Sequence, residues 1–245
     1  MKKFSLVIPF YNEAPSIPTV TSRVVECAKR RGLTPKVFEL VVVENGSRDN
    51  SGEVLRELLQ GEHKDYLRVV TIEINLGYGH GIYTGLKSCE STITGWTHGD
   101  EQTDPEDAFK AFDIIQANQK PTLVKGVRSG RSLPERVITR GHSLIASLIL
   151  FKRFREINAQ PKIFPAALLE TFDCPPKDFA LDIYSVIKAK EARYKVAEIP
   201  VEFPERPHGL SSWAGTFRSK MKHILNMIRY ILMYRFGLEK RYESN

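Results

Sequence analysis

Short runs of apolar, often β-branched residues alternate with amphipathic stretches through the first half of the chain. The apolar runs have the length of buried strands and occupy residues 4–9, 37–43, 67–73 and 93–97. After each run, apolar residues recur with a helical period, over about 15–31, 50–60, 82–88 and 106–118. The pattern predicts βαβ units, and therefore an α/β fold with a mostly parallel central sheet flanked by helices.

The pattern changes after a fifth apolar run at 123–126. A long helix is expected over 134–154, followed by a proline-containing segment, a helix over 179–190, a strand over 194–203 and a final amphipathic helix over 213–236. Neither long helix has the ~20 uninterrupted apolar residues that cross a bilayer, so both are candidates for lying on a membrane surface. We expect one main domain over 1–205 and a C-terminal loop and helix over 206–245.

The composition and the N-terminal segment indicate where in the cell the protein is expected. The chain is 42% hydrophobic and 27% charged, which is ordinary for a globular protein. Its three cysteines lie far apart with no metal-ligand spacing, so we expect a reducing compartment and no zinc site. The apolar run after Lys3 is short and is interrupted by Pro9, which favours a first strand over a signal peptide. A cytoplasmic location is expected.

Charge is distributed unevenly along the sequence. Residues 1–119 hold 13 basic and 17 acidic side chains, whereas residues 120–155 hold nine basic and one acidic, and residues 205–245 hold eight basic and three acidic. Such a division favours a site that handles a metal on one side and phosphates on the other. Nucleic acid is the competing partner. However, the basic segments contain the aliphatic runs 143–151 and 224–233, which suit a lipid surface better than a groove.

The loop between the strand at 93–97 and the next helix is dense in metal-capable oxygens. Asp100 and Gln102 stand two residues apart, so in an extended loop both side chains can point the same way and share one hard cation. The alternative is that Asp104 or Thr103 caps the helix and that Asp100 is a solvated turn residue.

Two earlier strand ends carry further candidates. Glu44 precedes the turn 45–47, which could receive a nucleotide base and ribose, or could simply cap the next helix through Ser47, Asp49 or Asn50. The glycines at 77, 79 and 81 have the spacing GxGxG at the third strand, which argues against a nicotinamide site. They predict either a close backbone approach to a ligand or tight packing of helix on strand.

Cations cluster after the fifth strand, at Lys125, Arg128, Arg131, Arg136 and Arg140. Arginine forks suit phosphate oxygens, so this cluster is expected to bind phosphate or a membrane and not merely to cover a solvated face. Near the C-terminus, the loop 206–213 either folds over an anionic ligand or caps the last helix through Ser211 or Ser212.

Taken together, five motifs in order resemble family 2 glycosyltransferases. They are Leu6–Glu13, Val43–Asp49, Asn75–Gly79, the Asp100/Gln102 loop with Pro105–Glu106, and Arg206-x-x-Gly209-x-Ser211. The closest likeness is to the dolichyl-phosphate mannose synthase and polyprenyl-phosphate sugar transferase branch, over nearly the whole chain. The resemblance implies a GT-A fold, an inverting mechanism, a divalent metal, a nucleotide-diphosphate sugar donor and often a polyprenyl phosphate acceptor.

The resemblance also assigns roles to residues. Asp100 and Gln102 would hold Mg²⁺ or Mn²⁺, and with Arg128 and Arg206 they form the expected catalytic set. The expected substrate-binding set is Pro9, Tyr11, Glu13, Glu44, Gly46, Asn75, Gly77, Gly79, His98, Lys125, Arg131, Lys162 and Ser211. Lys162 belongs to the segment 158–164, which resembles the acceptor side of many relatives, with Glu156 near a position that is often an aspartate.

Two positions depart from the family pattern. His98 stands where the first carboxylate of Asp-x-Asp is usual, and Asn45 replaces a common second acid. A neutral imidazole is a poorer ligand than a carboxylate for Mg²⁺ but is acceptable to Mn²⁺. His98 could instead hydrogen-bond the sugar or a phosphate.

The expected reaction is transfer of one sugar from a UDP- or GDP-sugar to a polyprenyl phosphate. Because a phosphate with a second pKa near ~6 is already nucleophilic, no strong base is needed. The nearest alternative is a glycan or other hydroxyl acceptor, with Glu156 or Asp182 as base. A second alternative is a non-catalytic nucleotide-sugar-binding or membrane-docking module. The sugar, the nucleotide, the lipid length and the oligomeric state stay open.

Overall fold

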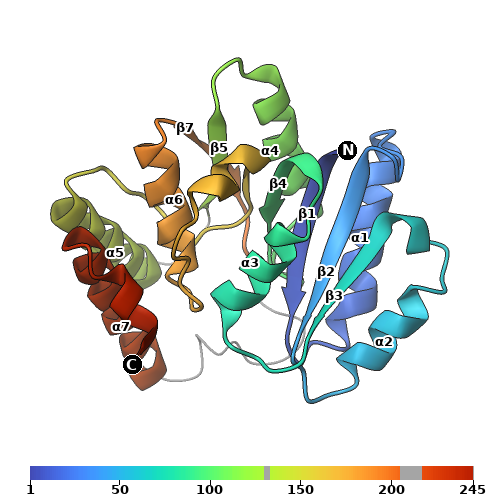
Figure 1. Ribbon diagram of the computed structural model, residues 1–245, viewed down its shortest axis with the longest axis horizontal. Coiled ribbons are helices and arrows are strands. Elements are labelled where there is room, and N and C mark those ends of the chain that lie inside the picture. Colours follow the sequence, from blue (N-terminus) through green and yellow to red (C-terminus); the bar gives the residue numbers. More distant parts are fainter. Residues whose placement is uncertain (130–132, 205–216, 245) are drawn as a thin grey trace.

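A seven-stranded sheet forms the centre of the protein, in the strand order β3-β2-β1-β4-β6-β5-β7 (Figure 1). The structure is a computed structural model and describes residues 1–129, 133–204 and 217–244. The strands are β1 Lys2–Phe10, β2 Phe38–Asn45, β3 Leu67–Ile72, β4 Ser91–Trp96, β5 Thr122–Arg128, β6 Lys162–Pro165 and β7 Lys195–Val201. The α-helices are α1 Ser16–Arg30, α2 Ser51–Leu58, α3 Tyr78–Lys87, α4 Pro105–Ala117, α5 Leu133–Leu150, α6 Leu181–Glu191 and α7 Phe217–Arg235.

Six of the seven strands run in the same direction, which confirms the mostly parallel sheet. β1 pairs in parallel with β2 and β4, β2 with β3, and β5 with β7. All eight residues of β2 are buried, as a strand covered on both faces must be. The loops that follow the parallel strands therefore gather at one edge of the sheet, which is where open α/β sheets bind ligands.

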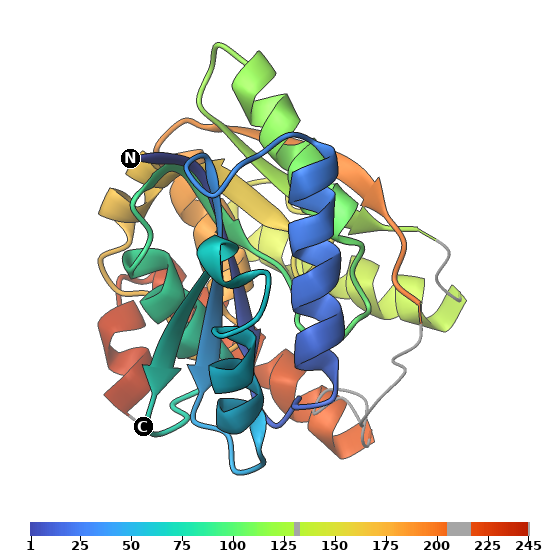
Figure 2. The ribbon, with the colours of Figure 1, turned by 90° about the vertical axis from the view of Figure 1, so that its right-hand side faces the viewer.

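Alternating side chains divide the core into two layers. Val7 and Val41 face the layer that contains α3 and α6, whereas Leu6 and Leu40 face the layer that contains α1 and α4. Figure 2 shows α1 lying along the second face. In that layer the rings of Phe4 and Phe112 stack with centroids 4.9 Å apart. Both faces of the sheet are thus covered by helices.

The short strand β6 is antiparallel to both of its neighbours and was not predicted from the sequence. It pairs with β4 and β5, so it separates two strands that the alternating pattern would have placed side by side. Two glycines make room for it. A Cβ on Gly95 would collide with Lys162 and Ile163, and one on Gly126 would collide with the carbonyl of Gln160. β6 can enter the sheet because both partners lack side chains at these points.

Helices α5 and α7 pack against each other at the end of the molecule beyond α6, with α1 and α2 at the opposite end (Figure 1). Met227, Tyr230 and Ile231 of α7 are buried in the same core layer as Ala146 of α5. No helix within the described parts of the chain has the length and apolarity to cross a membrane. The expected start of the last helix at 213 lies outside the described residues.

An ion-pair network joins α1 to α4. Glu106 accepts from Arg30 and Arg31, at 3.0 and 2.9 Å, and Arg31 also reaches Asp113 at 2.6 Å. A hydrogen bond from the Cys27 thiol, together with the two guanidinium groups, lowers the pKa of Glu106 from 4.5 to about 2. The thiol can donate because burial raises its own pKa to about 12.

Changing Glu106 to glutamine is expected to make the free energy of unfolding less dependent on pH in the acidic range. The pKa of Glu106 is lower in the folded protein than its ordinary value of 4.5. The ion pairs of Glu106 therefore stabilise the fold fully above pH 4.5, and this stabilisation is lost as the pH falls toward 2. Urea unfolding should therefore show wild type more stable than the variant near pH 6, with the difference shrinking at about pH 3. Glu53, on the exposed face of α2, provides the control, since its change to glutamine should have little effect at either pH. A wild-type advantage that is the same at both pH values would contradict the assignment.

Candidate functional site

Three hydrogen bonds lock together the loops that follow β1 and β2. The amide of Asn12 donates to Ser47 Oγ at 3.1 Å, and the amide of Arg48 donates to Asn12 Oδ1 at 2.8 Å. The amide of Ala14 reaches Asp49 Oδ2 at 3.2 Å. Asn12 adopts a φ of 53°, a conformation that asparagine tolerates better than most residues. The two loops form one surface. The predicted nucleotide-pocket residues Tyr11 and Glu13 lie in the first of these loops, and Pro9 lies near the end of β1.

Glu44 stands at the end of β2 in this surface. It is paired in register with Phe10, is only 8% exposed, and accepts the amide of Ser47 through Oε1 at 2.6 Å. The capping alternative is only partly right, because Asp49 binds the amide of Ser51 whereas Asn50, the residue before α2, makes no side-chain cap. Glu44 shapes the turn and also presents a carboxylate at the sheet edge.

The loop after β3 lies against the turn that follows Glu44. Gly46 has a φ of 71°, and a Cβ there would collide with the backbone of Asn75. The side chain of Asn75 in turn accepts the amide of Gly77 at 2.8 Å. The three residues belong to the expected substrate-binding set, and the structure brings them into contact with one another.

The glycines of the third motif lie against the chain itself. α3 begins at Tyr78, four residues earlier than the predicted start at 82, so Gly79 and Gly81 are helical and not part of the loop. A Cβ on Gly77 or Gly79 would collide with the backbone of residues 176–178, and the amide of His80 donates to Lys177 O at 3.0 Å. The close approach that these glycines allow is thus tight packing between segments of the protein.

The Asp100 loop is folded by its own side chains. Asp104 caps α4 by accepting the amide of Glu106 at 3.0 Å, as the alternative reading expected. Asp100 is nevertheless only 6% exposed, so it is not a solvated turn residue. Its Oδ1 accepts the amide of Gln102 at 3.2 Å, and Gln102 Nε2 donates to Pro204 O at 2.7 Å. The loop therefore holds a buried carboxylate at the sheet edge and contacts the chain after β7.

His98 lies between aromatic rings just before Asp100. Its centroid is 6.0 Å from that of Tyr78 and 5.9 Å from that of Phe203, and the Arg128 guanidinium lies over Phe203 at 4.4 Å. Burial lowers the pKa of His98 below 6.5, although Asp100 opposes the shift and Arg128 adds to it. His98 is therefore a neutral imidazole at neutral pH.

A buried polar network lies beneath His98. Asp182 Oδ1 accepts from Lys162 Nζ and from Gln160 Nε2, both at 2.6 Å, and Gln160 Nε2 also reaches the hydroxyl of Tyr78 at 3.1 Å. Lys162 and Asp182 are 0% and 1% exposed. The prediction that Lys162 contacts substrate needs correction, because its charge is neutralised inside the protein. Asp182 is likewise a structural anion and a poor candidate for a general base.

The other predicted cations have different surroundings. Lys125 is 2% exposed and pairs with Glu198 at 3.4 Å, so it too is a buried structural cation and not a surface phosphate ligand. Arg128 donates to Asn158 O at 2.7 Å and stays beside His98. Three further predicted residues, Arg131, Arg206 and Ser211, lie outside the described residues.

Three residues around His98 were not predicted as site residues: Tyr78, Gln160 and Phe203. An aromatic residue set between the glycines at 77 and 79 is a signal that could have identified Tyr78. Gln160 and Phe203 carry no comparable signal in the sequence. Gln160 contacts Asp182 of α6, and Phe203 contacts His98 and Arg128, which lie far away along the chain.

The donor atoms of the Asp100 loop fit a divalent cation of a particular kind. Across residues 1–129, 133–204 and 217–244, no group of three or more His, Cys, Asp or Glu side chains could hold a metal ion. Mg²⁺ usually binds one or two carboxylates and completes its shell with water and substrate phosphates. Asp100 and Gln102 therefore fit an ion that is shared with a bound diphosphate, and do not fit an ion caged by protein alone.

Comparison with solved structures shows the same architecture. Glucosyl-3-phosphoglycerate synthase from Mycobacterium tuberculosis, in complex with Mn²⁺, UDP and glucosyl-3-phosphoglycerate, superposes with a TM-score of 0.69 over 97% of this chain and 81% of that one, at 17% identity. The complex of the same enzyme with Mg²⁺ and UDP superposes with a TM-score of 0.67 over 97% of this chain and 80% of that one, at 16% identity. The fold is thus GT-A, as the sequence motifs predicted.

Sequence comparison points the same way. The undecaprenyl-phosphate 4-deoxy-4-formamido-L-arabinose transferase of Pseudomonas savastanoi pv. phaseolicola is 30% identical over 131 residues, which cover 54% of this chain but only 37% of that protein. The match thus spans little more than a third of that relative's length. The model of the family described as "Glycosyl transferase family 2" matches residues 5–225. The chain therefore belongs to glycosyl transferase family 2.

Proposed function

We propose that this glycosyltransferase moves one sugar, with inversion, from a UDP- or GDP-sugar to a polyprenyl phosphate at the cytoplasmic face of a membrane. The observation that carries the proposal is the buried Asp100 carboxylate at the sheet edge, with Arg128 and a neutral His98 beside it. That set provides a cation ligand and a phosphate ligand. The name of the undecaprenyl-phosphate relative supports the acceptor class.

The donor would lie across the loops of β1, β2 and β4. Glu44 would meet the base or ribose, and Pro9, Tyr11 and Glu13, at the end of β1 and in the loop after it, would line the same pocket. Asp100 with Gln102 would hold Mg²⁺ or Mn²⁺, which neutralises charge on the departing diphosphate. Arg128 would add a positive charge that needs no proton transfer.

The acceptor supplies its own nucleophile. A phosphate oxygen attacks the anomeric carbon, the bond from that carbon to the diphosphate oxygen breaks, and the nucleoside diphosphate departs with the electron pair. Because the phosphate is largely deprotonated at neutral pH, no protein base is required. This agrees with Asp182 being engaged by Lys162 and Gln160. A hydroxyl acceptor would need a base in its place.

The test is a partition assay. The protein is incubated with labelled UDP- and GDP-sugars, polyprenyl phosphate and Mn²⁺ or Mg²⁺, and the mixture is extracted with organic solvent. We expect metal-dependent label in the organic phase, and none when the unphosphorylated polyprenol replaces the acceptor. Label transferred only to a glycan or hydroxy-acid acceptor would overturn the lipid-phosphate proposal in favour of a hydroxyl acceptor. Nucleotide binding without consumption of any donor would favour a non-catalytic module.

A further inference from the structure

The outer side of α5 is apolar although it is exposed. Leu144 and Leu148, one helical turn apart, are 60% and 65% exposed, and Phe151, which directly follows the helix, is 78% exposed. Single exposed apolar side chains are ordinary on a protein surface. Two leucines on one face followed by an exposed phenylalanine form a larger apolar patch, which favours a partner.

Helix α7 has a second exposed stripe. Met221, Leu225, Leu232 and Phe236 are 37%, 57%, 41% and 72% exposed, and they recur at intervals of four and seven residues. The opposite side of this helix is already buried in the core. α7 is therefore apolar on two sides, of which packing within the protein covers one.

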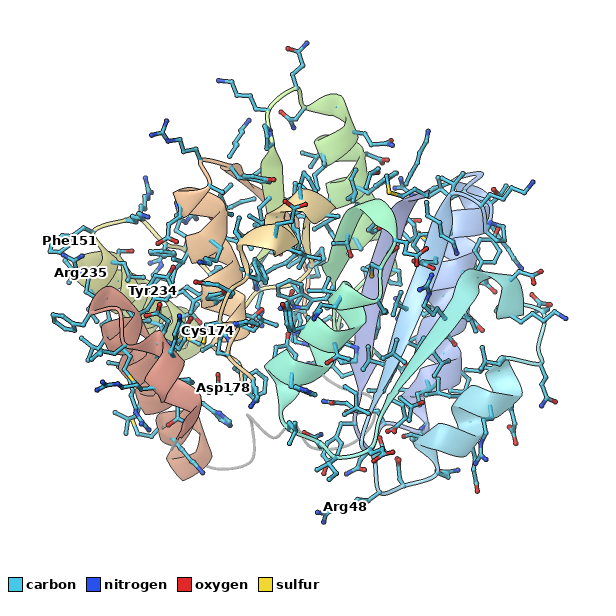
Figure 3. The ribbon with its side chains drawn as sticks, viewed as in Figure 1. Arg48, Phe151, Cys174, Asp178, Tyr234 and Arg235 are labelled. Atoms are coloured by element: carbon cyan, nitrogen blue, oxygen red, sulfur yellow. The ribbon has the colours of Figure 1, made fainter. Side chains whose placement is uncertain are left out.

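The two stripes meet where the helices end. α5 packs against α7, and the Arg235 guanidinium lies over the Phe151 ring at 5.0 Å. Figure 3 shows Phe151 and Arg235 together on the outer side of this end of the molecule. We call this surface the α5–α7 face; its apolar residues are Leu144, Leu148, Phe151, Met221, Leu225, Leu232 and Phe236.

The charge of these helices is strongly positive. Residues 133–155 contain five lysines or arginines and one acid, Glu135, and residues 217–238 contain five lysines or arginines and no aspartate or glutamate. Arg155 pairs with Glu198 at 3.3 Å, while Lys152 and Arg153 are exposed beside Phe151. Exposed apolar side chains on helices with a large excess of cations match the interface of an anionic bilayer.

A second copy of the chain fits this face poorly. A symmetric dimer through the face would bring the same excess of cations from both copies together. Like charges that face each other across an interface oppose association. Charge complementarity therefore selects the lipid surface as the occupant.

The α5–α7 face is also coupled to the candidate site. His223 of α7 contacts the ring of Phe179 at 5.2 Å, Phe179 stacks on Tyr78 at 4.7 Å, and Tyr78 lies beside His98. A continuous series of rings thus joins α7 to His98, which lies two residues before Asp100.

We propose that the α5–α7 face docks the protein on an anionic bilayer, with its apolar side chains at the boundary of headgroups and acyl chains and its cations on lipid phosphates. The proposed docking depends only on the α5–α7 face and does not require that the protein transfer a sugar. If the acceptor is the lipid phosphate proposed above, docking would also bring the protein to the surface that carries it.

Sedimentation with vesicles tests the proposal. The vesicles are phosphatidylcholine alone, or phosphatidylcholine with about 30% phosphatidylglycerol, and contain no polyprenyl phosphate, so the result does not depend on the proposed reaction. We expect wild type to sediment with the anionic vesicles, less at high salt, and weakly with phosphatidylcholine alone.

Two variants and one control sharpen the test. The pair Leu148→Asn and Phe151→Asn should lower the partition coefficient by more than about tenfold, since each buried leucine or phenylalanine contributes at least about that factor. The pair Lys152→Glu and Arg153→Glu should lower binding to anionic vesicles only. Ile74→Asn, which is 70% exposed after the edge strand β3, should bind like wild type.

Circular dichroism melting checks that the variants fold, which is expected because the changed residues are exposed. Wild type remaining in the supernatant with anionic vesicles would overturn the proposal. Unchanged binding by the Leu148/Phe151 variant would do the same. So would a concentration-dependent dimer, seen by light scattering, that this variant abolishes, because it would assign the face to a second copy.

Discussion

Exchanging Asp100 for asparagine is expected to lower the kcat for sugar transfer by about 10²- to 10³-fold, the usual effect of removing one group that stabilises developing charge. Asparagine has the size of aspartate and keeps an oxygen for the amide of Gln102, which donates to Oδ1 at 3.2 Å. The loop should therefore stay folded while the negative charge that attracts Mg²⁺ or Mn²⁺ is lost. Initial rates at saturating donor, together with Mn²⁺-dependent UDP binding by calorimetry, measure both effects.

Asp104 offers a matched control in the same loop. Its Oδ1 caps α4 by accepting the amide of Glu106 at 3.0 Å, and asparagine is an equally good N-cap. Asp104→Asn should therefore retain wild-type kcat and wild-type stability. If Asp100→Asn kept more than about a tenth of the wild-type rate, the electrostatic role of Asp100 would be disproved.

Replacing Asp182 with alanine is expected to lower the free energy of unfolding by about 3–5 kcal/mol, the typical cost of leaving one member of a buried ion pair alone. Lys162 would remain at 0% exposure without the carboxylate that lies 2.6 Å away, and Gln160 would lose an acceptor. Urea unfolding at neutral pH measures the loss. A cost below about 1 kcal/mol would show that the pair is not a main support of the network.

The matching control removes both charges at once. A Lys162→Met, Asp182→Leu protein should recover most of the stability, because a buried pair is often replaced by apolar residues at little cost. Stability of the Asp182 variant should also depend on pH. Burial lowers the pKa of Lys162 from 10.5 to about 8, and losing Asp182 lowers it further. Between that lower pKa and about 8, Lys162 of the variant is neutral in the folded state and protonated in the unfolded state, whereas wild-type Lys162 is protonated in both. The deficit of the variant should therefore shrink as the pH rises to about 8 and stay constant above it.

The βαβ plan and the positions of the strand-end loops could be read from the sequence, because the signals are local. Buried runs such as 37–43 are apolar throughout, and each is followed within a few residues by turn residues and a helical period. The direction of the strands then brings Glu44, Gly46, Asn75 and Asp100 to the same edge. For these residues, sequence order and strand direction determine location.

The features that were missed depend on distant partners. β6 has four residues, follows one proline and ends in another, so only the gaps at Gly95 and Gly126 reveal why it is a strand. Lys125 and Lys162 look like surface cations until Glu198 and Asp182 are placed beside them. A count of charges along the chain cannot distinguish a buried pair from a phosphate site, because both use the same side chain.

The antiparallel strand β6 separates the sheet into two groups of strands. β1–β4 carry Glu44 and Asp100 on one side, β5 and β7 lie on the other, and the ladder between these groups runs through β6 alone. Substitutions in the later half of the chain can thus shift β5 and β7 while the pairing of β1–β4, and with it the loops that carry Glu44 and Asp100, stays in place.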